Sequence, residues 1–170
     1  NLKPEAAFVK CVQVVGYTLA LYHPHSDSSC YGALVNITGA NPPTHDGEQS
    51  GGPINHCNVP LLEGQGNFGD HEDGPAAMRY TECRPTRYAY HTLMNREYMS
   101  VLPTVTTESG SDQEQCFLPA LLPNLLMNGA DGTAIALSTS IPSFTPASVA
   151  AATLAVLTAC KQDVLPSREK

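Results

Sequence analysis

The feature that most constrains the fold is a glycine-rich stretch in the middle of the chain. Residues 61–82 read LLEGQGNFGDHEDGPAAMRYTE, with glycines at positions 64, 66 and 69. Glycine allows tight backbone turns and close approach to a partner. Ala76 and Ala77 then leave room around Arg79 and Tyr80. The stretch therefore predicts a tight loop that presents one tyrosine nucleophile with one cation beside it.

Composition indicates a globular chain. Its 170 residues are long enough for one domain with a core, and 42% are hydrophobic while 15% are charged. Six scattered cysteines without a CxxC pair, and no signal-peptide pattern, favour free thiols and a cytoplasmic setting. The longest apolar run, 147–160, is too short and too rich in Ala and Thr to span a bilayer. We therefore predict no membrane role.

The charge balance argues against binding of a polyanion by overall charge. Nine Lys and Arg residues stand against sixteen Asp and Glu, a net charge of −7, whereas phosphate neutralisation normally leaves a basic footprint. Four arginines nevertheless fall within residues 79–96, at positions 79, 84, 87 and 96. A local basic patch around Tyr80 is predicted, with weak binding by this chain alone.

The N-terminal part predicts two short helices joined by a tight turn, a helix-turn-helix over about 5–38. The first has an apolar face and the second has an apolar stripe. The face comprises Phe8, Cys11, Val12, Val15 and Leu19, and the stripe Cys30, Ala33, Leu34 and Ile37. Pro24 separates them, and Ser26 or Asp27 can cap the second. Residues 39–60, rich in Gly, Pro, Asn and Asp, predict a surface insertion.

The rest of the chain predicts a helix, a hairpin and a last helix. A helix is expected over 88–99, after Pro85, and 108–115 is polar and turn-like. Residues 125–127 predict a strand that turns at 128–129 and returns over 133–137. Pro146, with Thr145 as its cap, predicts a helix to Cys160 that carries Val149, Thr153, Val156 and Cys160 on one side.

Three blocks of the sequence resemble one protein family in the same order. They are YHPHSDSSCY at 22–31, GQGNFG through MRYTE at 64–82, and LPALLPNLLMNGADGTAIALSTSIP at 118–142. They are similar to the A-type chain of DNA gyrase and of bacterial topoisomerase IV, which are type IIA topoisomerases. The resemblance implies an α+β winged-helix DNA-cleavage core over residues 1–170. Its parts would be the helix-turn-helix (about 5–38), the insertion (39–60), the active-tyrosine region (61–99), and the wing and last helix (117–161).

The resemblance also implies a chemistry. Tyr80 would attack a DNA phosphate with support from Arg79, forming a reversible 5′-phosphotyrosyl link that allows strand passage and resealing. The second helix would be the recognition helix, and the hairpin would be the wing. The DNA contacts would be His23, His25, Ser28, Ser29, Arg84 and Thr133. Thr133 stands where the family inserts an isoleucine between base pairs, which puts bending by intercalation in question.

The partners follow from the same resemblance. The chain offers no compact carboxylate cluster, and in the family Mg²⁺ is held by the metal-binding (Toprim) domain of a B-type subunit that also binds and hydrolyses ATP. We expect double-stranded DNA, a homodimer of this chain, and an A2B2 assembly with the B-type subunit. The family's tower, coiled coil and exit gate are not expected within these residues, so the chain is interpreted as a fragment or one piece of a divided subunit.

Two other functions are compatible with parts of the sequence. A catalytically silent winged-helix module for DNA binding or architecture would fit the acidic balance, Thr133, and the lack of the arginine pair that follows LKP in the family. A zinc module could be built around His23, His25 and Cys30, or around His45, His56 and Cys57, but neither spacing matches a closed Cys/His pattern.

Overall fold

The computed structural model describes residues 3–39, 57–70 and 73–161, which belong to two compact units. The N-terminal unit comprises residues 1–121 and the C-terminal unit residues 122–170. Each contains helices and antiparallel strands, so the predicted α+β class is confirmed. Within the described ranges, no helix is long and apolar enough to cross a membrane.

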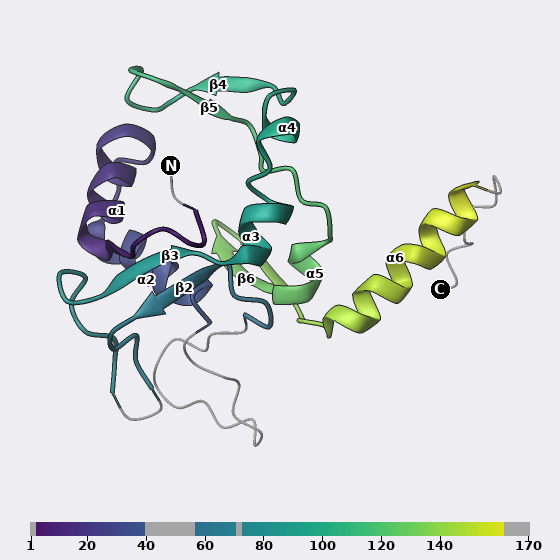
Figure 1. The fold of residues 1–170 in the computed structure, drawn as a ribbon, viewed down its shortest axis with the longest axis horizontal. Helices are drawn as coiled ribbons and strands as arrows, with labels where there is room; N and C mark the ends of the chain where they lie inside the picture. The colour runs from purple at the N-terminus through teal and green to yellow at the C-terminus, as the bar shows by residue number, and fades with distance from the viewer. Residues whose placement is uncertain (1–2, 40–56, 71–72, 162–170) are drawn as a thin grey trace. The chain divides into compact units, whose positions relative to one another are not determined.

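A small antiparallel sheet lies at the centre of the N-terminal unit. Its strands are β1 (Val9–Lys10), β2 (Leu62–Gln65) and β3 (Glu82–Pro85), in the order β1-β3-β2. Cys83 in β3 is opposite Val9 on one side and Gly64 on the other. Figure 1 shows β2 and β3 beside the N-terminal helices, with which they share one core. Because β3 begins two residues after Tyr80, the sheet fixes one end of the tyrosine loop.

Two helices precede strands β2 and β3, as predicted. They are α1 (Cys11–Tyr17), which continues into a π-helical turn, η1 (Thr18–Tyr22), and α2 (Asp27–Ile37). The turn around Pro24 separates them, and Ser26 occupies the N-cap position of α2 although its side chain caps no backbone group. The boundary predicted from Ser26 and Asp27 is therefore confirmed.

The buried faces of these helices differ in part from the prediction. Phe8 lies before α1, and Val12 is 41% exposed, so Cys11 and Val15 make the α1 contribution to the core. In α2, Ala33 and Ile37 are exposed. The residues of α2 that are buried are Tyr31, Leu34 and Val35. The predicted stripe is therefore confirmed for Leu34, which is buried, and for Cys30, which packs against the core. The burial of Tyr31 was not predicted, and its hydroxyl bonds to residues 45 and 50 positions away, which sequence periodicity cannot reveal.

The predicted insertion at 39–60 falls mostly at 40–56, outside the described residues. Its two described ends lie together. The Leu61 N–H donates to the Ile37 carbonyl at 3.0 Å. A Cβ built on Gly39, which has a φ of +65°, would stand 2.7 Å from Pro60. The chain therefore leaves α2 and returns to β2 at nearly the same point, which is the geometry expected of an insertion.

After β3 the single helix predicted over 88–99 is two shorter ones. These are α3 (Arg87–Thr92) and α4 (Arg96–Met99). Thr86 caps α3 by accepting from the Ala89 N–H, and Asn95 caps α4 by accepting from the Glu97 N–H. The second cap competes with helix continuation, which explains the break. The turn-like region is a hairpin, β4 (Thr104–Thr106) and β5 (Gln113–Gln115), whose Ser109 donates to the Leu21 carbonyl at 2.8 Å.

The C-terminal unit begins with a correction. Residues 125–127, predicted as a strand, lie in a short helix, α5 (Asn124–Asn128). The Pro123 carbonyl accepts from the Leu126 N–H at 3.0 Å, and Gly129, with a φ of +70°, ends the helix. A run of three apolar residues does not distinguish strand from helix, so Pro123 before it and Gly129 after it decide the outcome.

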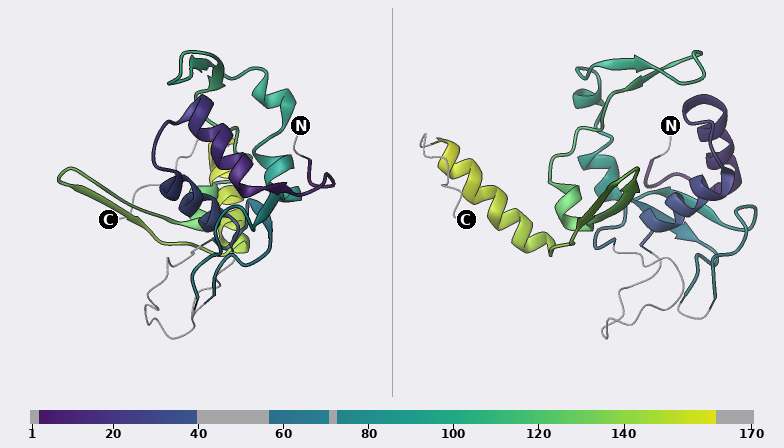
Figure 2. Two further views of the ribbon diagram at one scale, coloured as in Figure 1. Left: turned by 90° about the vertical axis from the view of Figure 1, so that its left-hand side faces the viewer. Right: turned by 180° about the vertical axis from the view of Figure 1, so that it is seen from behind.

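The hairpin of this unit starts later than predicted. It consists of β6 (Ala130–Ala134) and β7 (Leu137–Ile141), so Thr133 lies in the first strand, opposite Ser138. Figure 2 shows the two strands as an extended ribbon. The last helix, α6 (Pro146–Lys161), begins at Pro146 as predicted, and Thr145 accepts from the Ser148 N–H at 3.3 Å. The helix pair and this hairpin belong to different units, so the winged-helix arrangement stays a prediction.

Candidate active site

Tyr80 lies in a tight turn that leads into β3. Its N–H donates to the Ala77 carbonyl at 2.9 Å, which closes the turn. The tyrosine side chain is 63% exposed. The Arg79 guanidinium carbon lies 4.6 Å from the centre of the Tyr80 ring. The turn therefore presents a phenol to solvent with a permanent cation against it, as the sequence predicted for this pair.

A hydrogen-bond network fixes the backbone on either side of Tyr80. The Tyr31 hydroxyl, reaching from α2, donates to the Ala76 carbonyl at 2.7 Å. Its single proton is thus used, so Thr81 is the donor in the 2.9 Å hydrogen bond between the two hydroxyls. Thr81 is fully buried. Burial raises the pKa of the Tyr31 phenol, although the bond from Thr81 opposes this, and the phenol stays protonated as a donor.

The start of α1 fixes the same turn from another direction. The Cys11 N–H donates to the Thr81 carbonyl at 3.0 Å, and the Val12 N–H donates to the Met78 carbonyl at 3.1 Å. The first amides of a helix have no partner within it, so these bonds satisfy them. The backbone around Tyr80 is consequently held at Ala76, Met78 and Thr81. The side chain of Tyr80 nevertheless stays exposed to solvent.

The glycine-rich loop packs against this turn where a side chain would not fit. Gly66 has a φ of +107°, and a Cβ there would lie 3.3 Å from the Tyr80 carbonyl oxygen. A Cβ on Gly64 would stand 2.6 Å from the Phe68 ring. Gly69 has a φ of +95°. The close approach that the glycines predicted is confirmed, and it brings the loop against the backbone of the tyrosine.

Two buried thiols lie behind the turn. Cys11 is fully buried and Cys83 is 3% exposed, and neither forms a disulfide. Burial, together with the neighbouring Cys11, raises the pKa of the Cys83 thiol to about 12. A thiol of this kind is protonated at neutral pH and inert. Of these two thiols and the Tyr80 phenol, only the phenol is exposed to solvent.

The sequence of this chain matches a known protein family. The family of the A subunits of DNA gyrase and topoisomerase IV matches residues 1–168. The chain belongs to that family. It is 41% identical over 145 residues to the A subunit of DNA topoisomerase 4 from Caulobacter vibrioides, covering 84% of this chain and 17% of the relative. It is 37% identical over 143 residues to the A subunit of DNA gyrase from Synechocystis, covering 84% and 15%.

A third relative gives the same picture. The A subunit of DNA gyrase from Staphylococcus aureus is 36% identical over 145 residues, covering 84% of this chain and 14% of the relative. The chain thus spans between 14% and 17% of the length of these curated relatives. The gyrase/topoisomerase IV family is established by the match, and the Tyr80 turn lies within the matched residues.

The four predicted DNA contacts before and on α2 are all exposed. His23 and His25 stack with ring centres 4.3 Å apart, and His23 Nδ1 lies 3.7 Å from a carboxylate oxygen of Glu108. Ser28 and Ser29 lie in the first turn of α2, where the Ser28 N–H donates to Asp27 Oδ1 at 2.8 Å. They form a polar surface at the start of the helix, and their role in DNA binding stays a prediction.

Arg84 is already engaged within the protein. Its guanidinium donates to Glu63 Oε2 at 2.8 Å and to the Ala6 carbonyl at 3.1 Å, and it lies 4.3 Å from the centre of the Phe8 ring. The hydrogen bond from Arg84 lowers the pKa of the Glu63 carboxyl. A phosphate contact by Arg84 would have to compete with these groups, and that contact too stays a prediction.

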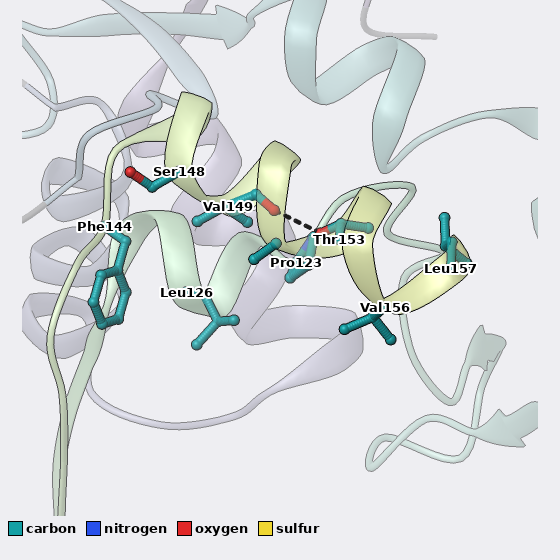
Figure 3. Close-up of a pocket in the computed structure, with 9 residues that line it drawn as sticks. Pro123, Leu126, Phe144, Ser148, Val149, Thr153, Val156 and Leu157 are labelled. Carbon is teal, nitrogen blue, oxygen red and sulfur yellow. Dashed lines mark hydrogen bonds between the residues drawn. The ribbon is translucent and has the colours of Figure 1, made fainter. Parts of the chain in front are cut away.

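The C-terminal unit contains Thr133 and an apolar cavity. Thr133 is exposed on the hairpin. A cavity of about 530 Å³ lies between α5 and α6. Its lining residues, drawn in Figure 3, include Val149, Thr153 and Val156 of α6, together with Leu126 and Phe144. The side of α6 predicted to be apolar is thus confirmed for Val149, Thr153 and Val156, whereas Cys160 is exposed and does not line the cavity. None of the described residues that line the cavity is charged, so it lacks groups for chemistry on phosphate.

The sequence predicted a role for Arg79 and Tyr80 but gave none to the residues that hold their backbone. Tyr31 and Thr81 both fall inside the motifs quoted for the family resemblance, but neither was given a role. The available signal was a threonine hydroxyl next to Tyr80 in the sequence. Among the described residues, no three His, Cys, Asp or Glu side chains lie close enough together to hold a metal ion.

Proposed function

We propose that this chain is the DNA-cleaving core of a type II topoisomerase A-type subunit. Tyr80 Oη attacks a backbone phosphorus, the bond from phosphorus to the 3′ oxygen breaks, and a 5′-phosphotyrosyl link forms. The phenol loses its proton and the leaving 3′ oxygen gains one. The reverse reaction reseals the strand after another duplex has passed through the break.

The observation that carries this proposal is the exposed Tyr80 side chain on a fixed backbone beside Arg79. Attack on a phosphodiester requires a nucleophile held in line with its target, and misplacement by about 1 Å can cost roughly 100-fold in rate. The bonds at Ala76, Met78 and Thr81 supply that positioning. Arg79, whose guanidinium is always charged, supports the negative charge that develops on the phosphate oxygens.

The remaining requirements are assigned to partners. Two strands must be cut, so the functional unit contains two copies of this chain. A B-type subunit brings magnesium and the hydrolysis of ATP, giving an A2B2 assembly on double-stranded DNA. The helix pair and the β6–β7 hairpin would form a winged-helix surface for that DNA, with His23, His25, Ser28, Ser29 and Thr133 on it.

A second function, DNA binding without cleavage, has its own support. The chain carries a net charge of −7, and the Arg84 guanidinium is bound to Glu63 rather than presented to a ligand. Weak binding to DNA fits a chain whose role is assembly or architecture. The two functions differ in whether Tyr80 becomes linked to DNA.

The deciding experiment is cleavage of supercoiled plasmid with magnesium and a B-type subunit. The natural chain is compared with Tyr80→Phe, which keeps the ring and removes the nucleophilic oxygen, after a detergent and protease quench. We expect linear and nicked DNA with covalently attached peptide only from the natural chain. If both chains bind plasmid equally and neither cuts it, the architectural function replaces the enzymatic one.

A further inference from the structure

The N-terminal unit contains a cleft that takes no part in the proposed cleavage chemistry. It has a volume of about 700 Å³ and shares no lining residue with the Tyr80 turn. Its walls come from the N-terminal segment, η1, α3, α4 and β5. Apart from two methionines, they are Lys3, Tyr22, Tyr90, Arg96, Ser100 and Gln115. A cleft of this size is in the range that holds small molecules or one unit of a polymer.

The charge of the cleft is opposite to that of the chain. Among the described residues that line it, Lys3 and Arg96 are the charged ones and none is a carboxylate, although the whole chain carries −7. Both cations are exposed to solvent. A concave surface lined by charge of one sign concentrates ligands of the other, so this cleft favours an anion.

Two aromatic rings accompany the cations. Tyr22 is 38% exposed and ends η1, whose closing bond runs from the His23 N–H to the Thr18 carbonyl at 2.8 Å. A π-helical turn is rare and frequently marks a functional site. Here its last residue, Tyr22, is a lining residue of the cleft. Tyr90 lines it from α3. Tyr22 is exposed and Tyr90 is half-buried. Aromatic rings and cations that line one cleft are the combination on which nucleic-acid bases stack while phosphates are neutralised.

Polar groups for recognition are present as well. The Ser100 hydroxyl donates to the Glu97 carbonyl at 2.7 Å, so its oxygen can accept a further hydrogen bond. The Gln115 amide offers both a donor and an acceptor. We propose that the cleft binds a nucleotide unit, either free or within a single strand. Its phosphate lies against Lys3 and Arg96, and its base lies against a tyrosine ring. This inference does not depend on the chemistry of Tyr80.

The test uses the whole chain and a short fluorescein-labelled oligothymidylate, with binding followed by fluorescence anisotropy at low salt. Tyr22→Leu removes the ring, and we expect binding to weaken roughly 5- to 100-fold, the usual value of one stacked base. Tyr22→Phe keeps the ring and should bind within about 2-fold of the natural chain, because stacking does not need the hydroxyl.

The contribution of charge to binding is tested by the same substitution at two arginines, one inside the cleft and one outside it. Arg96→Gln should weaken binding at least about 5-fold, since a charge-assisted contact is lost. Arg87→Gln makes the same change of charge on α3 outside the cleft, where Arg87 lies 3.6 Å from a carboxylate oxygen of Glu5. It should change binding by less than about 2-fold. Equal losses of affinity in the two arginine variants would overturn the site, because oligonucleotide binding would then depend on the overall charge of the chain alone.

Competitors separate the sources of the ligand. Displacement of the labelled strand by thymidine monophosphate would assign the cleft to free nucleotides. Failure of the monophosphate, with displacement by unlabelled single strand, would assign it to the polymer. A blunt duplex that competes as well as the single strand, with the same loss in Tyr22→Leu, would contradict base stacking and overturn the proposal. Binding here can succeed while plasmid cleavage fails, so the two proposals fail separately.

Discussion

The Tyr80 turn and the β6–β7 hairpin both present exposed side chains, but they are held differently. The turn is fixed by donors from two helices, at Cys11, Val12 and Tyr31. The hairpin pairs its own two strands with each other over residues 130–141, and its side chains described from 131 to 140 are exposed. Ile135, at its tip, is 98% exposed.

This difference corresponds to two kinds of task. A nucleophile must be placed before its substrate arrives, and rigid support from packed elements achieves that. A two-stranded ribbon without such support is marginally stable in water and is completed by what it lies against. The proposed winged-helix function fits this division, because the turn would carry the chemistry and the hairpin would take its final support from DNA.

The largest effect is expected for Tyr31→Phe, which tests whether the hydrogen bonds of Tyr31 position Tyr80. It removes one hydroxyl, leaving the Ala76 carbonyl and the Thr81 hydroxyl without their partner. We expect the free energy of unfolding to fall by about 1–3 kcal/mol and plasmid cleavage to fall by roughly 10-fold or more, since the turn loosens. Tyr17→Phe, at a tyrosine that is 68% exposed, should change neither quantity. Unchanged cleavage by folded Tyr31→Phe would show that the network does not position Tyr80.

The second test concerns the close approach of the glycine loop. Gly66→Ala places a Cβ 3.3 Å from the Tyr80 carbonyl oxygen at a φ of +107°. We expect a loss of about 1–2 kcal/mol in the free energy of unfolding, measured by urea denaturation. Gly74→Ala is the control, because nothing lies within 4 Å of its built Cβ and its φ is outside the positive range. Equal effects of the two changes would contradict the argument.

The sequence predicted what depends on neighbouring residues. Arg79 and Tyr80, the start of α2 after Ser26 and the start of α6 at Pro146 all follow from local motifs. The Tyr31 network joins residues 45 and 50 positions apart and could not be read from periodicity. The short helix α5 was mistaken for a strand because three apolar residues fit either structure. Thr133 was therefore placed in the wrong strand of the hairpin.

The buried Cys83 thiol behind the turn predicts an alkaline loss of stability. The folded pKa of Cys83, about 12, lies above the ordinary thiol value, so the unfolded chain loses its proton first as pH rises. The contribution is complete below about pH 8.5 and declines as pH rises toward the folded value. Urea denaturation at several alkaline pH values should show a shallower decline for Cys83→Ala. Cys116→Ala, at an exposed thiol, should keep the natural slope.

The smallest effect is expected in the hairpin. Ala136, in the turn between β6 and β7, has a φ of +62°, a conformation that costs a residue with a Cβ about 1–2 kcal/mol. Ala136→Gly relieves this but gives the unfolded chain more freedom, so we expect a net gain of less than about 1 kcal/mol. Slower amide hydrogen exchange in the peptide covering 130–141 would show this gain in the stability of the hairpin.

The same change at an exposed position of α6, Ala151→Gly, should have the opposite sign and destabilise the helix by about 1 kcal/mol. If Ala136→Gly instead speeds exchange in the hairpin, the turn is not strained. Strain in the turn would then not distinguish the hairpin from the Tyr80 turn.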